Sequence, residues 1–262
     1  MKIIIKTAML ACLIFASCTS EKKEASRTLE TQTITEKPLL AQAQTLSETF
    51  ITKSLYVNAP SGLSLRESTN LKSKKILTLP YGAQVKHLSA PAHTSMTIEG
   101  ISGNMIEVAY QGATGFVFNG FLSDLAPPFQ DEAIEAYAKR ISIENAPVTV
   151  TKKTNEKGAA FGQTTVILLP AKGWNEAYAI SKRLFDLPKS LSLDLSGLSG
   201  PMVIENANKR IKTLIDEIAV VHNTHNEIDK IVYTYSLKTY GRTITIMKDR
   251  QGFTVTEIEV SK

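Results

Sequence analysis

The chain has 262 residues, of which 43% are hydrophobic and 21% are charged. This composition supplies real cores for one or two ordinary domains and excludes a disordered or fibrous protein. The formal net charge of +5 is spread along the chain and forms no dense basic run, which argues against nucleic acid as a partner.

The first 17 residues have the pattern of a secretion signal. Lys2 and Lys6 precede an apolar run, residues 7–16, that is too short to span a bilayer. The run ends in "FASC", which resembles the lipobox of bacterial lipoproteins, although Phe15 stands where that family usually has Leu. The resemblance implies that Cys18 is lipidated and that, with about two acyl chains, it anchors the protein to a membrane of the cell envelope, on the periplasmic or outer surface. Ordinary signal cleavage is the alternative.

The only other cysteine, Cys12, lies within the signal. The mature fold is therefore expected to have no disulfide, no thiolate metal site and no cysteine nucleophile. Residues 18–53 are rich in Glu, Lys, Thr, Gln and Ser, a composition that predicts a flexible tether.

Residues 54–126 contain short apolar runs separated by Gly, Pro, Asn and Ser, as small all-β units do. Leu63 and Leu65 alternate with Ser64 and Arg66, so we expect the leucines to face a core and the polar pair to face water. Turns are expected within "LPYG" and at "QG", residues 111–112. Five short strands in about 70 residues predict a small β-barrel.

Two segments of this region, "GLSLRESTNLKSKKILTLPYGAQV" and "GNMIEVAYQGATGFVFNGFL", resemble a bacterial SH3 domain. The residues that fall on the family pattern are Leu63, Leu65, Arg66, Gly82, Val85, Val108, Gly112, Gly115, Phe116 and Val117. Asn104-Met105 replaces a Gly-Trp pair that is frequent in the family, and the loop from His87 to Gly103 is longer than a minimal barrel needs. The resemblance implies a binding module for peptidoglycan stem peptides or another envelope protein.

Aromatic side chains are the candidate ligand contacts in this barrel. Tyr81 and Tyr110 are expected near turns or strand ends, where they could form a shallow peptide groove with Phe118. The alternative is that all three pack the barrel.

Pro127-Pro128 marks the expected boundary to a second domain, residues 129–262. Its patterns predict helices at residues 131–141, 174–188 and 201–221, strands at 146–153 and 159–170, and a meander at 229–237, 242–248 and 253–260. The fold class is thus mainly β plus α+β: an SH3-like β-barrel followed by an α+β domain with an antiparallel sheet and two to three helices.

Three details of this second domain are specific enough to check. The longest helix depends on an apolar stripe: Ile204, Ala207, Ile211, Leu214, Ile215 and Ile218. A β-bulge near Thr256 is expected, because Phe253 and Val255 have a different parity from Ile258 and Val260. Trp174 is expected to begin its helix, with Tyr233 and Tyr235 in the core of the sheet.

No motif in the chain predicts catalysis. His222 and His225 could share a helical face with Glu227 or Asp229, but no His-Glu-x-x-His motif supports a metal site. "SGLSG", residues 196–200, has the wrong spacing for a serine nucleophile turn, and no glycine loop has the ending that binds phosphate. We therefore expect no cofactor and no metal.

The first hypothesis is a noncatalytic, lipid-anchored envelope protein that binds a peptide-like partner through its SH3-like domain. Two alternatives remain open. One is an envelope hydrolase with an unrecognised active site in the C-terminal domain, and the other is a purely structural surface lipoprotein.

Overall fold

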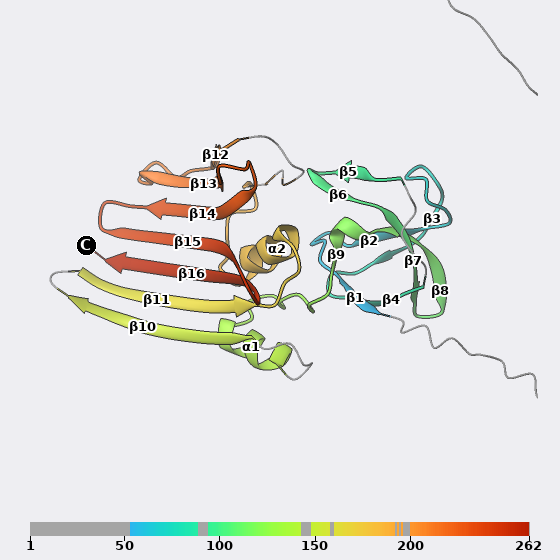
Figure 1. Ribbon diagram of the computed structural model, residues 1–262, viewed down its shortest axis with the longest axis horizontal. Coiled ribbons are helices and arrows are strands. Elements are labelled where there is room, and N and C mark those ends of the chain that lie inside the picture. Colours follow the sequence, from blue (N-terminus) through green and yellow to red (C-terminus); the bar gives the residue numbers. More distant parts are fainter. Residues whose placement is uncertain are drawn as a thin grey trace, which may run out of the picture. The chain divides into compact units, whose positions relative to one another are not determined.

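The computed structural model describes residues 53–88, 94–142, 148–157, 160–191, 193, 195 and 200–261. All of these residues belong to one compact unit, Thr49–Lys262. The expected signal, Cys18, nearly all of the expected tether and the "SGLS" segment at 196–199 lie outside the described residues. The described part is mainly β, with antiparallel sheets and two α-helices (Figure 1).

The first of two seven-stranded sheets has the order β3-β2-β8-β7-β4-β1-β9. Its strands are β1 (Ser54–Val57), β2 (Leu63–Arg66), β3 (Lys75–Leu79), β4 (Gln84–His87), β7 (Met105–Tyr110), β8 (Ala113–Phe118) and β9 (Leu122–Ser123). A separate hairpin, β5 (Met96–Ile98) with β6 (Ile101–Gly103), and a 3-10 turn, η1 (Asn119–Phe121), complete this half of the unit. The order of described strands runs from β3 to β9 without closing on itself, so the SH3-like barrel stays a prediction.

The core of this small sheet confirms the alternation expected in β2. Leu65 has no exposed surface and Leu63 is 7% exposed, whereas Ser64 and Arg66 are only partly buried. The expected turn after β3 is present, and the Ala83 N–H donates a hydrogen bond to the Pro80 carbonyl at 3.1 Å.

The expected turn between β7 and β8 is also confirmed. Gln111 and Gly112 have φ of 47° and 84°, the pair of positive values that a two-residue hairpin turn requires.

The larger sheet has the order β10-β11-β16-β15-β14-β13-β12 (Figure 1). Its strands are β10 (Thr149–Lys157), β11 (Ala160–Leu169), β12 (Met202–Glu205), β13 (Ile215–His222), β14 (Ile228–Ser236), β15 (Tyr240–Asp249) and β16 (Gly252–Ser261). Every neighbouring pair is antiparallel. The expected meander is therefore confirmed as β14, β15 and β16.

One face of the larger sheet packs against two helices, α1 (Ile134–Ser142) and α2 (Trp174–Leu184). The helices bury Tyr137, Ile141 and Ile180 in the same core as the strand residues Ile167 and Val255. Trp174 begins α2, as expected, and its ring contacts the ring of Phe253 edge-on, with centroids 4.9 Å apart. Tyr233, 4% exposed, lies in this core, and Tyr235 packs against it.

The expected long helix at residues 201–221 is wrong. The segment forms β12 and β13, which pair from Met202↔Val220 to Glu205↔Glu217. The supposed stripe does not lie on one surface, because Ile218 is fully buried whereas Ile211 is fully exposed. The buried positions of β13 are Asp216, Ile218 and Val220, which is the two-residue period of a strand.

Two further expectations about this domain also change. His222 ends β13 and His225 lies in the turn to β14, so the two histidines do not share a helical face. The bulge near Thr256 is also wrong, because the register of β15 and β16 is continuous from Tyr240↔Ser261 to Asp249↔Gly252. Ile258 points away from the core and is 42% exposed.

The expected boundary at Pro127-Pro128 is a packed connection. Leu125 and Ala126 belong to the core of the larger sheet, and both prolines are buried. Arg140 of α1 donates to the Pro127 carbonyl at 3.0 Å. The chain therefore leaves the small sheet directly into the core of the larger one.

Candidate functional site

A groove of about 240 Å³ opens on the small sheet and is the candidate site. Its walls come from segments far apart in the sequence. One is residues 59–64, which comprise the turn before β2 and the start of β2, and the other is Ile98 and Glu99 of the β5–β6 hairpin. Met105, Phe118 and Phe121 also line it. Only the folded chain brings these segments together.

The floor of the groove is apolar and tightly packed. Met105 and Phe118 are Cα partners in the β7–β8 pair and are 1% and 3% exposed. The rings of Phe118 and Phe121 meet edge-on with centroids 5.5 Å apart. The two rings therefore pack against each other below the groove without any ligand.

Two glycines let the β5–β6 hairpin approach this floor. A Cβ atom on Gly103 would lie 2.5 Å from Asn119 Oδ1, and one on Gly120 would lie 2.3 Å from the Phe118 ring. The Asn119 side chain accepts a hydrogen bond from the Asn104 N–H at 2.8 Å. The long loop that departs from the bacterial SH3 pattern therefore supplies one wall of the groove.

The rim of the groove is polar and carries both charges. Ser61, Ser64, Arg66 and Glu99 all line it. Arg66 is oriented by a hydrogen bond of 2.8 Å from its guanidinium to the Ser73 carbonyl. Leu71, 41% exposed, adds an apolar contact at the edge. An apolar floor with hydroxyls and opposite charges around it suits a peptide-like ligand that offers small apolar groups and amides.

The structure brings one of the three predicted contacts, Phe118, to the groove. Tyr110 lies at the other end of the β7–β8 hairpin, opposite Ala113, and packs against the small core. Tyr81 lies in the turn after β3, and neither tyrosine lines the groove. Ligand binding by the two tyrosines stays a prediction.

The surroundings of Tyr81 are contacts within the chain. Its hydroxyl donates to the Pro128 carbonyl at 3.0 Å, and the Arg183 guanidinium lies 5.4 Å from the ring centroid. Burial raises the pKa of the Tyr81 hydroxyl to about 12, although the positive charge of Arg183 opposes the shift. Tyr81 thus ties the small sheet to the connection that follows it.

Sequence reasoning missed Met105, Phe121 and the hairpin residues Ile98 and Glu99. In the sequence, Met105 stands in place of a Trp that is frequent in the family this region resembles, and this difference could have drawn attention to the position. The unusual length of the loop that contains the hairpin was a weaker indication, because length alone does not show where the loop folds.

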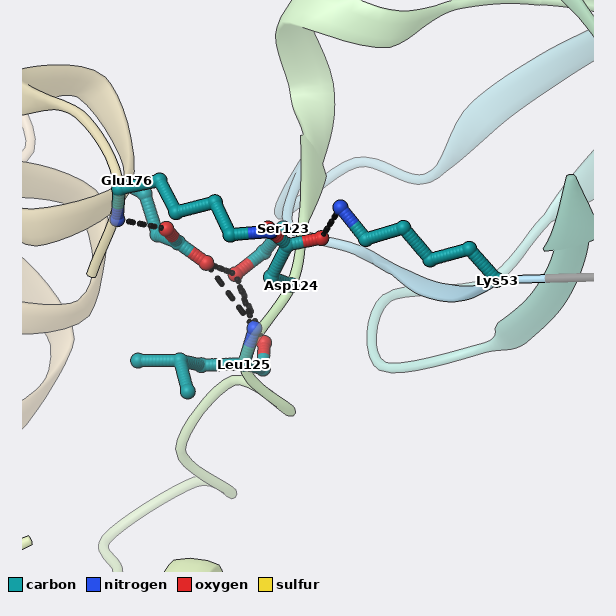
Figure 2. A network of polar contacts seen from close by, with 6 residues as sticks. Lys53, Ser123, Asp124, Leu125 and Glu176 are labelled. Atoms are coloured by element: carbon teal, nitrogen blue, oxygen red, sulfur yellow. Dashed lines mark hydrogen bonds and ion pairs between the residues drawn. The ribbon is translucent and has the colours of Figure 1, made fainter. Parts of the chain in front are cut away.

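A polar network joins the end of the small sheet to α2 (Figure 2). Glu176 accepts hydrogen bonds from the Ser123 hydroxyl at 2.6 Å and from the Leu125 N–H at 2.9 Å. Asp124 forms ion pairs with Lys53 and Lys172. Both carboxylates already have partners within the chain. We call this network the joint, because it connects the end of the small sheet to α2.

The charge of Asp124 is stabilised by this joint. Burial alone would raise the pKa of Asp124, but the hydrogen bonds and charges of Lys172 and Lys53 outweigh it and lower the pKa below its ordinary value of 3.8. The carboxylate therefore stays ionised at neutral pH.

Across the described ranges, no group of three or more His, Cys, Asp or Glu side chains is arranged to hold a metal ion. Within the same ranges, no helix has the length and apolar character needed to cross a membrane. No family model, curated protein or solved structure matches the chain.

Proposed function

We propose that this chain is a noncatalytic, lipid-anchored protein of the cell envelope that binds a peptide-like partner through the groove of its SH3-like half. The partner class is a peptidoglycan stem peptide or a segment of another envelope protein. The observation that carries the proposal is the groove itself, with Met105, Phe118 and Phe121 below a rim of Ser64, Arg66 and Glu99.

The dimensions of the groove favour a short stretch of chain over a compact ligand. Its volume of about 240 Å³ is smaller than the roughly 300–1,000 Å³ of typical small-molecule pockets. A shallow groove with a rigid apolar floor instead holds one or two side chains of an extended ligand, while hydroxyls and charges at the rim bind its amides and termini.

The anchor is proposed from the N-terminal sequence. A multiply acylated Cys18 would hold the protein at the membrane surface, since about two acyl chains are needed for stable attachment. Cys18→Ala is expected to move the protein from the membrane fraction to the soluble fraction of disrupted cells. Membrane retention of this variant would contradict the anchor without affecting the groove.

Binding is tested by sedimentation of residues 19–262 with purified cell wall. Leu71→Asp places a charge at the apolar edge of the groove and is expected to weaken binding about tenfold, the loss of one apolar contact. Ile76→Asp is the matched control, because Leu71 and Ile76 are both 41% exposed and Ile76 does not line the groove.

Three outcomes of this binding experiment are informative. Wild-type binding that Leu71→Asp weakens and Ile76→Asp leaves intact supports the proposal with a wall peptide as partner. Release of soluble wall fragments would instead indicate the hydrolase. A wild-type protein that neither sediments with wall nor is retained on immobilised envelope proteins contradicts the binding function.

A further inference from the structure

The larger sheet has a second face, opposite the one that packs on α1 and α2, which we call the outer face. Its central row takes one residue from each strand, and neighbours in the row are Cα partners. In sheet order from β12 to β10 the row is Val203, Ala219, Val232, Thr245, Thr256, Val166 and Thr151. No residue of this row is charged.

The rows on either side are also largely uncharged. One contains Glu205, Glu217, Thr234, Thr243, Ile258, Thr164 and Lys153, and the other contains Val221, Lys230, Met247, Thr254, Leu168 and Thr149. Their charges lie towards the margins, acidic on β12 and β13 and basic on β10, apart from Lys230 near the hairpin end of β14.

This face is exposed in the described structure. Val203 is 61%, Met247 45% and Ile258 42% exposed, and none of the twenty residues in the three rows is buried. By contrast, the inward-pointing Ile246 and Val255 have no exposed surface. A broad sheet face with outward apolar side chains and few charges is the kind of surface that another sheet covers.

We propose that two copies of this chain pack their outer faces together as a β-sandwich, with a two-fold axis running along β15. This inference is independent of the groove and of its proposed ligand. β15 is the middle strand of the sheet, so such an axis places the two copies of β15 over each other and β12 of one copy over β10 of the other.

The charge pattern of the outer face favours a second copy of this chain as the partner that covers it. Rotation about this axis sets Glu205 at one margin opposite Lys153 of the second copy, and it brings no two like charges together. Val221 falls opposite Leu168, and Met247 opposite Met247. A two-fold axis across the strands would instead lay one acidic margin over the other, which like-charge repulsion disfavours.

The size of the face is sufficient for a stable dimer. Seven strands about 4.8 Å apart and three to four rows about 7 Å apart give a surface of roughly 600–900 Å² per copy. A standard interface buries about 800 Å² per partner. The outer face therefore matches a self-association in the micromolar range or tighter.

The first test is the mass in solution of residues 19–262, by sedimentation velocity and light scattering from about 1 to 100 µM. A dimer is expected within this range. Thr245→Lys places two ammonium groups beside the axis and should raise the dimer Kd at least about 100-fold. Thr78→Lys, on the exposed face of β3, is the matched control and should leave the dimer unchanged.

The second test uses the marginal charges Glu205 and Lys153, whose side chains are exposed. Glu205→Lys alone and Lys153→Glu alone should each raise the Kd about tenfold, because each introduces two like-charge contacts per dimer. The double variant should return to within about threefold of the wild type.

Two results overturn the proposal. A monomer at about 100 µM shows that no second copy covers the face. A dimer that Thr245→Lys and the single charge reversals leave intact is formed through another surface. A far-UV circular dichroism spectrum that matches the wild-type spectrum establishes for each variant that lost association is not lost folding, because loss of a dimer by itself lowers the unfolding temperature.

Discussion

The two seven-stranded sheets of this protein are built in different ways. Strands of the small sheet have two to six residues, and its hairpin and turns meet at glycines where a single added carbon would clash. Strands of the larger sheet have up to ten residues in continuous register, and its core is formed by large side chains. Close glycine contacts thus recur at several turns of the small sheet, whereas the larger sheet has one at Gly252 and is held mainly by its large buried core.

The largest expected effect comes from the volume of the larger core. Phe253 is 1% exposed and packs on Trp174, so Phe253→Ala should lower the free energy of unfolding by about 3–5 kcal/mol. Urea denaturation at pH 7 measures it. Ile258→Ala on the same strand is the control and should cost less than about 1 kcal/mol in the monomer, because Ile258 points outward. Equal losses in both variants would contradict the assignment of the two faces.

A middle-sized effect is expected at Gly103, in the hairpin of the small sheet. Gly103→Ala would place its Cβ 2.5 Å from Asn119 Oδ1 and 2.9 Å from the Phe118 ring. The hairpin must shift to relieve this contact, which should cost about 1–3 kcal/mol and weaken binding at the groove. Gly173→Ser, where no atom lies within 4 Å of the added Cβ and the position caps α2, should be neutral. An unaltered stability of Gly103→Ala would show that the small sheet does not depend on this contact.

The smallest effect concerns the joint between the two sheets. Asp124→Asn removes the ion pairs with Lys53 and Lys172 and should lower the free energy of unfolding by about 1 kcal/mol at pH 7. Because the folded-state pKa of Asp124 lies below 3.8, this contribution is complete above that pH and is lost as the pH falls through the folded-state pKa.

The difference between wild type and Asp124→Asn should therefore shrink below about pH 4. Thermal melts between pH 2 and pH 7 measure it. Glu67→Gln removes the exposed pair with Lys74 and should change stability little at any pH. A constant difference between wild type and Asp124→Asn across this range would contradict the ionised joint.

The sequence allowed the local pattern of the small sheet to be predicted well. Leu63 and Leu65 alternate with polar residues, and Gln111-Gly112 provides a turn that only certain residues adopt. These local patterns did not show where each segment lies relative to the others in the folded chain. Nothing local to the "IEG" segment at 98–100 says that it folds back over Phe118, because that contact depends on the glycines at 103 and 120.

The two wrong predictions in the larger sheet share one cause. In β13 a polar residue, Asp216, points inward, where it accepts hydrogen bonds from Tyr233 and Asn206. Ala219 and Val221 point outward, so the alternation of the strand is hidden and a helical stripe is seen instead. In β16 the outward Ile258 suggested a bulge for the same reason. Where a sheet also has apolar side chains on its outer face, the hydrophobic pattern no longer tells which residues point to the core.

The position of β1 gives the fold a mechanical property. β1 pairs with β4 on one side and with β9 on the other, in both cases antiparallel. If Cys18 is held in a membrane and the groove is held by the wall, tension enters the fold at Ser54 and acts along β1. The hydrogen bonds of both ladders lie across the strand, so they are loaded in shear together instead of opening one after another. Under the proposed attachment, β1 is the first described strand to bear the load, and two ladders hold it.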